Sequence, residues 1–372
     1  MFSTIIIFIA VLSLLVFVHE LGHFLVAKKM GMKVEEFGFG FPPRLFSIKK
    51  KETIYSINWI PLGGFVRIKG ESGAFVEDSD SFASKKAWKR FLVLVAGVTM
   101  NLVLAAVLLS AGFMAGLPAI VEGELPVGAR VSDEEIIVMS LVSESPASVA
   151  GVEIGDKLVS IDSLVFESTN EAREYIGANG DDGVEIVIER DDSEFYTYNL
   201  VSEDLSGFDV HGVGVGFVET AFVSYPIHTA VFQGVVATGY YTVAVMDAFL
   251  KIIVNLFTAQ GLGAELSGPV GIAVLTGEVA ALGFVYLLQF AAILSINLAI
   301  INILPFPALD GGRVLFLIIE KIRGKAANQK VEAIVHNLGF LLLMLVVVFV
   351  TYRDFVTFGD SIWGGLKSVV GM

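Results

Sequence analysis

The sequence predicts a polytopic α-helical membrane protein with about four transmembrane helices and one inserted α+β domain. The first observation is composition: 55% of the 372 residues are apolar and the mean hydropathy is +0.74, well above ordinary soluble domains. The second is a set of four apolar runs along the chain that are candidates to cross a bilayer. The third is a polar block at 118–220, which has the size of one small domain and contains several short strand patterns.

The first apolar run, Ile5 to Ala27, has 23 residues and would be about 34 Å long as a helix, enough to span the hydrocarbon core. Lys28 and Lys29 follow it at once, which suggests that this end faces the cytoplasm. We expect a retained helix rather than a cleaved signal, because no basic residue precedes the run and no small-residue cleavage site follows it.

The C-terminal half of this run contains a His-Glu-x-x-His motif at residues 19–23. On a helix, His19 and His23 project from one face and can share a metal ion. Glu20 lies beside them, placed to act as a general base on a water at that metal. Two histidines and a carboxylate are costly among apolar side chains, unless they have a partner or a water-filled cavity.

Residues 33–70 predict a β-loop between the first two spans. Glycines and prolines separate three short strand patterns at Phe39–Phe41, Ile54–Trp59 and Phe65–Ile68. Two interpretations stay open. The segment is either a plain cytoplasmic loop or a sheet whose edge lies near the metal motif, where a substrate adds as a strand.

The second span is predicted at Phe91 to Gly116, directly after the basic residues of 87–90. Asn101 is its one strongly polar interior residue. A lone amide in a spanning helix is more often a helix–helix hydrogen bond than a catalytic group, and we favour that interpretation.

The polar block at 118–220 is acidic, with 23 of the 39 Asp and Glu residues and only 4 of the 25 Lys and Arg residues. Its segment Ser145 to Asp162 resembles the signature of a PDZ domain, with a short helix, a Gly-Asp turn and a strand in succession. Later strands are expected at 184–189, 195–201 and 213–217. Such a domain either binds an extended peptide at a sheet edge or acts as a spacer or size filter without a peptide.

Residues 221–278 are apolar but repeatedly interrupted, and we expect amphipathic helices lying at the membrane surface. The third span is predicted at Val279 to Leu304, where Pro305 and Pro307 break the helix next to a cavity. Leu338 to Tyr352 is the last span, short but nearly all apolar.

Charge supports this count of four spans. The loop at 28–90 holds 13 of the 25 basic residues, and a second basic loop lies at 313–330. Four spans place both loops on the cytoplasmic side, with the acidic domain and both termini on the other side. A fifth span at 230–256 would separate the two basic loops, which is why we expect none there.

The same number of membrane crossings also brings the candidate metal-binding and catalytic residues together. The first and third spans then run in the same direction, so Asp310 reaches the depth of His19, Glu20 and His23. Two histidines, one carboxylate and an open position form a familiar hydrolytic zinc site. The chain has no cysteine, so thiolate ligands are excluded, and its net charge of −14 argues against a nucleic-acid partner.

This combination resembles the site-2 protease family of intramembrane zinc metalloproteases, specifically the bacterial proteases of regulated intramembrane proteolysis. The resemblance implies that His19, His23 and Asp310 hold Zn2+, that Glu20 is the base, and that Asn302 holds substrate near the metal. It covers nearly the whole chain, including a membrane-associated β-loop and a single PDZ-like domain. The remaining matching elements are Pro61–Phe65, Ala96 and Gly97 with Asn101, Ser267–Gly271 and Asn302–Gly312.

The resemblance further implies a multi-pass protein of the bacterial inner (cytoplasmic) membrane with the active site toward the cytoplasm. Expected partners are the lipid bilayer and single-span membrane proteins, such as an anti-sigma factor or a remnant signal peptide, with a possible peptide ligand of the PDZ-like domain. The expected organisation is 1–117, 118–220, 221–278 and 279–372. The alternative is a non-proteolytic PDZ scaffold with a vestigial metal site, against which the intact Glu20 argues.

Overall fold

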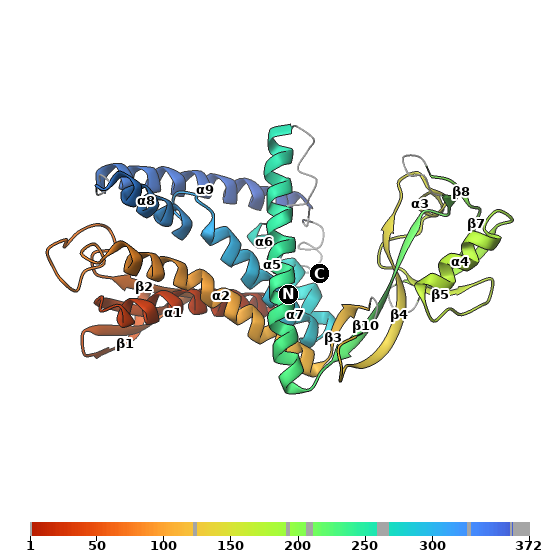
Figure 1. The fold of residues 1–372 in the computed structure, drawn as a ribbon, viewed down its shortest axis with the longest axis horizontal. Helices are drawn as coiled ribbons and strands as arrows, with labels where there is room; N and C mark the ends of the chain where they lie inside the picture. Colours follow the sequence, from red (N-terminus) through yellow and green to blue (C-terminus); the bar gives the residue numbers. More distant parts are fainter. Residues whose placement is uncertain are drawn as a thin grey trace, which may run out of the picture. The chain divides into compact units, whose positions relative to one another are not determined.

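The structure is a computed structural model that describes residues 2–121, 125–190, 194–205, 211–258, 268–325, 329–357 and 359. The chain divides into two compact units. The helical unit comprises Met1–Gly112 with Val231–Met372, and the α+β unit comprises Phe113–Ala230. Figure 1 shows long helices in the first unit and a twisted sheet in the second.

Five helices among the described residues are long and apolar enough to cross a membrane, which confirms a polytopic membrane protein. They are α1 (Phe2–Lys29), α2 (Ala87–Ala115), α5 (Ile227–Thr258), α7 (Phe284–Ile303) and α9 (Gln329–Thr357).

Within the region 221–278, where we expect membrane-surface helices, α5 is a single continuous helix of 32 residues. By length and composition it adds a fifth candidate to the four expected spans. Its polar residues interrupt the apolar run but not the backbone, since Gln, Lys and Asn are tolerated in helix interiors.

The predicted third span begins too early. Residues 279–282 belong to a separate helix, α6 (Pro269–Leu282), and α7 starts after Gly283, whose φ of 129° favours glycine. The buried Asp354 of α9 accepts hydrogen bonds from the backbone amides of Gly268, Val270 and Gly271 at 2.9–3.1 Å, which ties α9 to the start of α6. Ser267 lies outside the described residues.

The proline-rich end of the third span is as expected. The helix α7 stops at Ile303, before Pro305 and Pro307, because proline lacks the amide that the next turn needs. The chain resumes as α8 (Asp310–Arg323), so that Asp310 is its first residue.

The β-loop consists of two long strands, β1 (Val34–Lys50) and β2 (Thr53–Ile68), which extend well beyond the predicted fragments. Each strand pairs twice with the other. Residues 34–39 pair with 64–68 on one side and with 54–57 on the other, while 44–50 pair with 53–58. The result is a small sheet in which 64–68 and 44–50 form the two edges.

The main sheet of the α+β unit has the order β3-β10-β4-β5-β6-β7, and β8 pairs with β9 in a separate two-stranded sheet. The predicted later strands are confirmed as β6, β7 and β10, but α4 and the long β4 were not predicted. The bounds are β3 Leu117–Ile120, β4 Arg130–Leu141, α3 Pro146–Ala150, β5 Lys157–Ile161, α4 Thr169–Asn179, β6 Val184–Arg190, β7 Glu194–Leu200, β8 Glu203–Asp204, β9 His211–Gly212 and β10 Val215–Ser224.

A buried ion pair ties the Gly-Asp turn of this unit to β6. The Asp156 side chain is 1% exposed and accepts from Arg190 Nε at 2.7 Å and from Arg190 Nη2 at 2.8 Å. It also accepts from the backbone amide of Glu153 at 2.8 Å, which closes the turn after α3.

We predict that Asp156→Asn lowers the free energy of unfolding of the α+β unit by about 3 kcal/mol at pH 7, because it leaves Arg190 without its buried charged partner. Burial raises the pKa of Asp156, but the bonds from Arg190 and the Glu153 amide outweigh it and lower the pKa. The ionised carboxylate therefore stabilises the unit above its unfolded pKa of about 4, and this contribution disappears as pH falls through the folded pKa.

Hydrogen exchange of β5 and β6 in the full-length chain measures the effect, and the gap between wild type and variant should shrink below about pH 4. Glu153→Gln is the matched control, since Glu153 also pairs with Arg190 but is 65% exposed. It should change stability by less than about 1 kcal/mol. An equal loss of stability in Asp156→Asn and Glu153→Gln would contradict the prediction that the buried Asp156 contributes more than Glu153.

Candidate metal centre

Three side chains that are distant in sequence meet in the helical unit. His19 and His23 lie one turn apart on α1, and their Nε2 atoms are 3.1 Å from each other. Asp310 Oδ2, at the start of α8, lies 3.1 Å from His19 Nε2 and 3.2 Å from His23 Nε2. Both histidines are 7% exposed, so the cluster is buried. These three form the one potential metal-binding group found among the described residues.

The cluster fits zinc by geometry and by donor type. Ligands about 2.0–2.1 Å from a tetrahedral zinc lie roughly 3.4 Å from one another, close to the distances seen here. Imidazole nitrogens and a carboxylate oxygen are also the donors that hydrolytic zinc sites use, and the chain has no cysteine to offer a thiolate instead.

The α2 helix forms the wall behind the two histidines. Gly97 lies so close that a Cβ there would be 2.4 Å from His23 Nε2 and 2.6 Å from His19 Nε2, so no side chain fits. His23 Nδ1 donates to the backbone carbonyl of Val93 at 2.7 Å. Asn101 is fully buried, and its Nδ2 lies 3.3 Å from His19 Nδ1.

Sequence reasoning considered Asn101 and favoured a helix–helix role, but the structure places it beside a histidine of the cluster. A signal for this was present in the spacing. Residues 93, 97 and 101 are four apart and share one face of α2, the face that meets the motif.

Glu20 lies between the cluster and the β-loop. Its Oε2 accepts a hydrogen bond from the backbone amide of Val66 at 3.0 Å. That amide points away from β1, because residues 64–68 are an edge of the small sheet. Glu20, His23, Asp310 and Val66 line one cavity of about 190 Å³.

A second, larger cavity of about 410 Å³ adjoins the first. The two share Glu71, Phe82, Ala308 and Arg313 in their walls, and Arg313 pairs with Glu71 between them. The larger cavity is also lined by Arg90, which binds Glu320 at 2.6 Å. Charged side chains therefore line both cavities, including the one that the cluster of His19, His23 and Asp310 does not reach.

The loop before Asp310 is held by α9. Ala308 has a φ of 83°, an unfavourable backbone conformation for a residue with a side chain, and its amide donates to His336 Nδ1 at 2.9 Å. Gly339 of α9 lies against Pro307, where a Cβ would be only 2.5 Å from the Pro307 carbonyl oxygen.

The other three histidines and Asn302 are not part of the cluster. His211 of the α+β unit pairs with Asp181 and Asp204, and His228 lies in the first turn of α5. His336 contacts the loop before Asp310 and is not part of the cluster. Asn302 lies in the last turn of α7, partly buried.

Comparisons with known proteins identify the family of the chain. The model of Peptidase family M50 matches residues 7–346. Zinc metalloprotease RasP of Geobacillus kaustophilus is 32% identical, covering 95% of this chain and 97% of that protein. Regulator of sigma-W protease RasP of Bacillus subtilis is 31% identical, covering 95% and 98%. A putative zinc metalloprotease of Clostridium perfringens is 34% identical, covering 92% and 96%.

Among solved structures, the PDZ domain of an SdrC-like protein from Listeria monocytogenes is similar to 24% of this chain and 92% of its own length, with 24% identity and a TM-score of 0.21. The family match spans most of the chain, and the relatives named as zinc metalloproteases exceed 30% identity over nearly their full length. The chain therefore belongs to Peptidase family M50, the site-2 protease family, and is an intramembrane zinc metalloprotease.

Proposed function

We propose that His19, His23 and Asp310 hold the zinc ion and that Glu20 is the general base. The observation that carries this proposal is the convergence of three ligand atoms within 3.1–3.2 Å of one another, with Glu20 in the wall of the same cavity. Neither the geometry nor the relatives favours the alternative of a non-proteolytic scaffold.

The chemistry then divides between the metal and the protein. Bound zinc supplies a Lewis acid and a water that ionises near neutral pH. Glu20 takes the proton from the attacking water and delivers it to the leaving amine. The Val66 amide keeps the Glu20 carboxylate at the cavity edge until a substrate arrives.

A transmembrane helix hides its carbonyl groups in its own hydrogen bonds, so a substrate has to unwind locally before attack. We propose that the unwound segment adds as a strand at the 64–68 edge of β2. Support comes from the cavity, which Phe65, Val66 and Ile68 share with Glu20 and Asp310. Asn302 is the proposed contact that holds this segment near the metal.

The proposed substrates are single-span membrane proteins cleaved within or near the bilayer, such as an anti-sigma factor or a remnant signal peptide. The relative from Bacillus subtilis is named a regulator of sigma-W protease, which supports the first class. The region 118–220 is proposed to be a PDZ-like domain that admits trimmed substrates or binds a peptide.

We further propose four spans, α1, α2, α7 and α9, with the metal cluster toward the cytoplasm and the α+β unit and both termini outside. The cluster joins the C-terminal half of α1 to Asp310, which comes seven residues after the end of α7, so these two helices run in the same direction. Two helices run in the same direction when an odd number of crossings lies between them, and α2 is one such crossing. If α5 also crossed the membrane, α7 would run in the opposite direction. Helix α6 has 14 residues, about 21 Å, and is too short to restore the direction.

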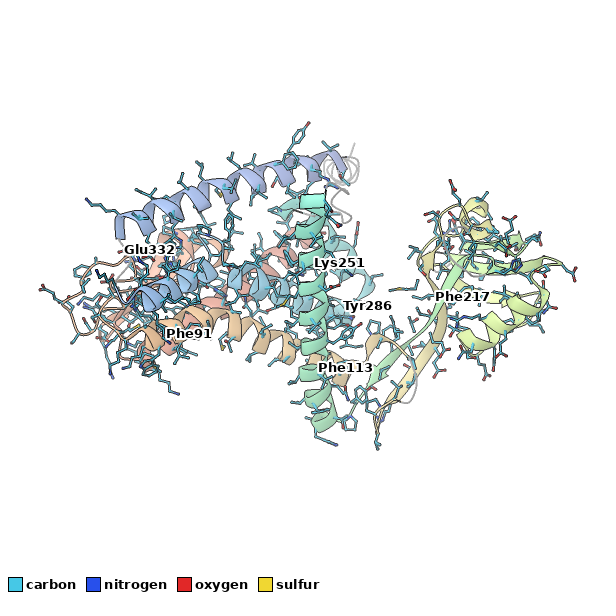
Figure 2. All side chains as sticks on the ribbon, turned by 45° about the horizontal axis from the view of Figure 1, so that its top comes forward. Phe91, Phe113, Phe217, Lys251, Tyr286 and Glu332 are labelled. Atoms are coloured by element: carbon cyan, nitrogen blue, oxygen red, sulfur yellow. The ribbon has the colours of Figure 1, made fainter. Side chains whose placement is uncertain are left out.

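Features of α5 support a place along the membrane surface. Within the helical unit it runs across the directions of α1 and α2 (Figure 1). Its Asp247 and Lys251 form an exposed ion pair at 2.7 Å, and Lys251 projects from the helix (Figure 2). An exposed charged pair suits an interfacial helix better than one surrounded by lipid.

We predict that Glu20→Gln retains zinc but loses cleavage of a model single-span substrate by a factor of about 10²–10⁴, because the amide cannot accept the proton. Asp310→Ala should lose both zinc and cleavage, since it removes a ligand. Zinc content and turnover are measured on purified protein in detergent. Wild-type turnover by Glu20→Gln would refute the base assignment, and full zinc content in Asp310→Ala would refute the ligand assignment.

The strand-addition proposal predicts where a trapped substrate lies. A photo-crosslinking amino acid at Arg67, on the edge beside Glu20, should crosslink to substrate held by the Glu20→Gln variant. The same group at Phe46, on the opposite edge and 57% exposed, should not. Equal yields at both positions, or a crosslink at Phe46 alone, would place the substrate elsewhere.

The topology proposal predicts labelling by a membrane-impermeant maleimide, and each probe is unique because the chain has no cysteine. Val165→Cys in the α+β unit should react in intact cells, and Lys51→Cys in the β-loop only after permeabilisation. Lys251→Cys should react in intact cells if α5 lies along the outer surface. Reaction of Lys251→Cys only after permeabilisation would mean that α5 crosses the membrane.

A further inference from the structure

Asn101 stands out as the one strongly polar residue in the interior of α2. It is 0% exposed on α2, and its Nδ2 lies 3.3 Å from Nδ1 of His19. His19 Nδ1 is the ring nitrogen that does not face Asp310 and His23. Asn101 therefore contacts the imidazole nitrogen opposite the one that would bind zinc. A hydrogen bond at this nitrogen determines which of the two ring nitrogens carries the proton.

The proton position matters because a histidine binds a metal through an unprotonated nitrogen. If the Asn101 amide nitrogen donates to His19 Nδ1, the ring proton has to sit on Nε2, toward the metal. If the amide oxygen faces His19 instead, it accepts a proton from Nδ1 and leaves Nε2 free. The two ends of an amide have nearly the same shape, so the hydrogen-bond network decides between them.

The proposed zinc role of His19 requires the oxygen. With the amide nitrogen toward His19, Nδ1 has no acceptor in Asn101, and the buried Oδ1 of Asn101 has no hydrogen-bond partner in the described part of the chain. Turning the amide by half a turn pairs Oδ1 with Nδ1–H of His19, and it leaves Nε2 of His19 free for the metal.

His23 shows the same arrangement with a fixed acceptor. Its Nδ1 lies 2.7 Å from the Val93 carbonyl, which can only accept, so the proton of His23 is on Nδ1 and its Nε2 is free. The α2 helix thus supplies one acceptor behind each histidine. For His23 the acceptor is a backbone atom, and for His19 it is a replaceable side chain.

The contact between α2 and α7 uses a different part of Asn101. The Ser295 hydroxyl of α7 donates to the Asn101 backbone carbonyl at 2.8 Å. Helix–helix hydrogen bonding therefore does not require the amide side chain. This separation allows the two roles to be tested independently.

We propose that Asn101 is a positioning residue for zinc binding, holding His19 in the tautomer with the proton on Nδ1. The proposal rests on the proposed role of His19 as a zinc ligand. Loss of such an outer partner typically weakens metal binding by about 10- to 100-fold.

The test compares Asn101→Leu, which has a similar size and no acceptor, with Asn101→Asp, which keeps an acceptor. Zinc affinity of the purified full-length chain is measured by competition with a chelator. Asn101→Leu should bind zinc about 10- to 100-fold more weakly, and Asn101→Asp should bind it nearly as tightly as wild type. The visible absorption of the Co2+-loaded protein should change in Asn101→Leu and be restored in Asn101→Asp.

Ser295→Ala is the matched control, because it removes the α2–α7 hydrogen bond and leaves the side chain of Asn101 in place. It should keep wild-type zinc affinity. Wild-type affinity in Asn101→Leu, or an equal loss in Ser295→Ala, would overturn the proposal. If Asn101→Leu does not fold, Asn101→Ala against Asn101→Asp makes the same comparison. Retained zinc in His19→Ala would instead refute the ligand assignment itself, so the two failures are distinguishable.

Discussion

A close approach between α1 and α2 is the constraint on which the rest of the structure depends. A Cβ at Gly22 would be 2.4 Å from the Ala96 carbonyl, and one at Gly97 would collide with both histidine rings. Only backbones without side chains at these two points allow the helices to pack this tightly. The tight contact brings the acceptors of α2 within hydrogen-bond distance of the His-Glu-x-x-His motif.

This packing addresses a problem that the bilayer creates. Ionisable groups among apolar side chains are stable when they have partners, and each group of the cluster has one. The histidines contact Asp310 and α2, Glu20 contacts the edge of the β-loop, and Arg313 contacts Glu71. The two adjoining cavities are lined by Glu20, His23, Asp310, Arg313 and Glu71 and share the last two in their walls.

Much of this organisation was predictable from local patterns. The spacing of His19 and His23 and the prolines before Asp310 identified residues that the structure brings together across 291 positions. Patterns could not give the length of the strands, because β1 and β2 are stabilised by pairing twice with each other. The isolated amide of Asn101 did not by itself reveal its partner, although its spacing from Val93 and Gly97 places all three on one face of α2. Polar residues within the apolar run gave no sign that α5 is one continuous helix, because single polar residues do not break a helix.

The loop between α7 and α8 links the metal cluster to α9. Ala308 keeps a strained backbone conformation while its amide is bonded to His336, and Asp310 follows two residues later. The position of this proposed zinc ligand thus depends on where α9 lies. In thermodynamic terms the two equilibria are linked, and linkage is reciprocal. If a displacement of α9 weakens zinc binding by a given free energy, bound zinc makes that displacement less favourable by the same free energy.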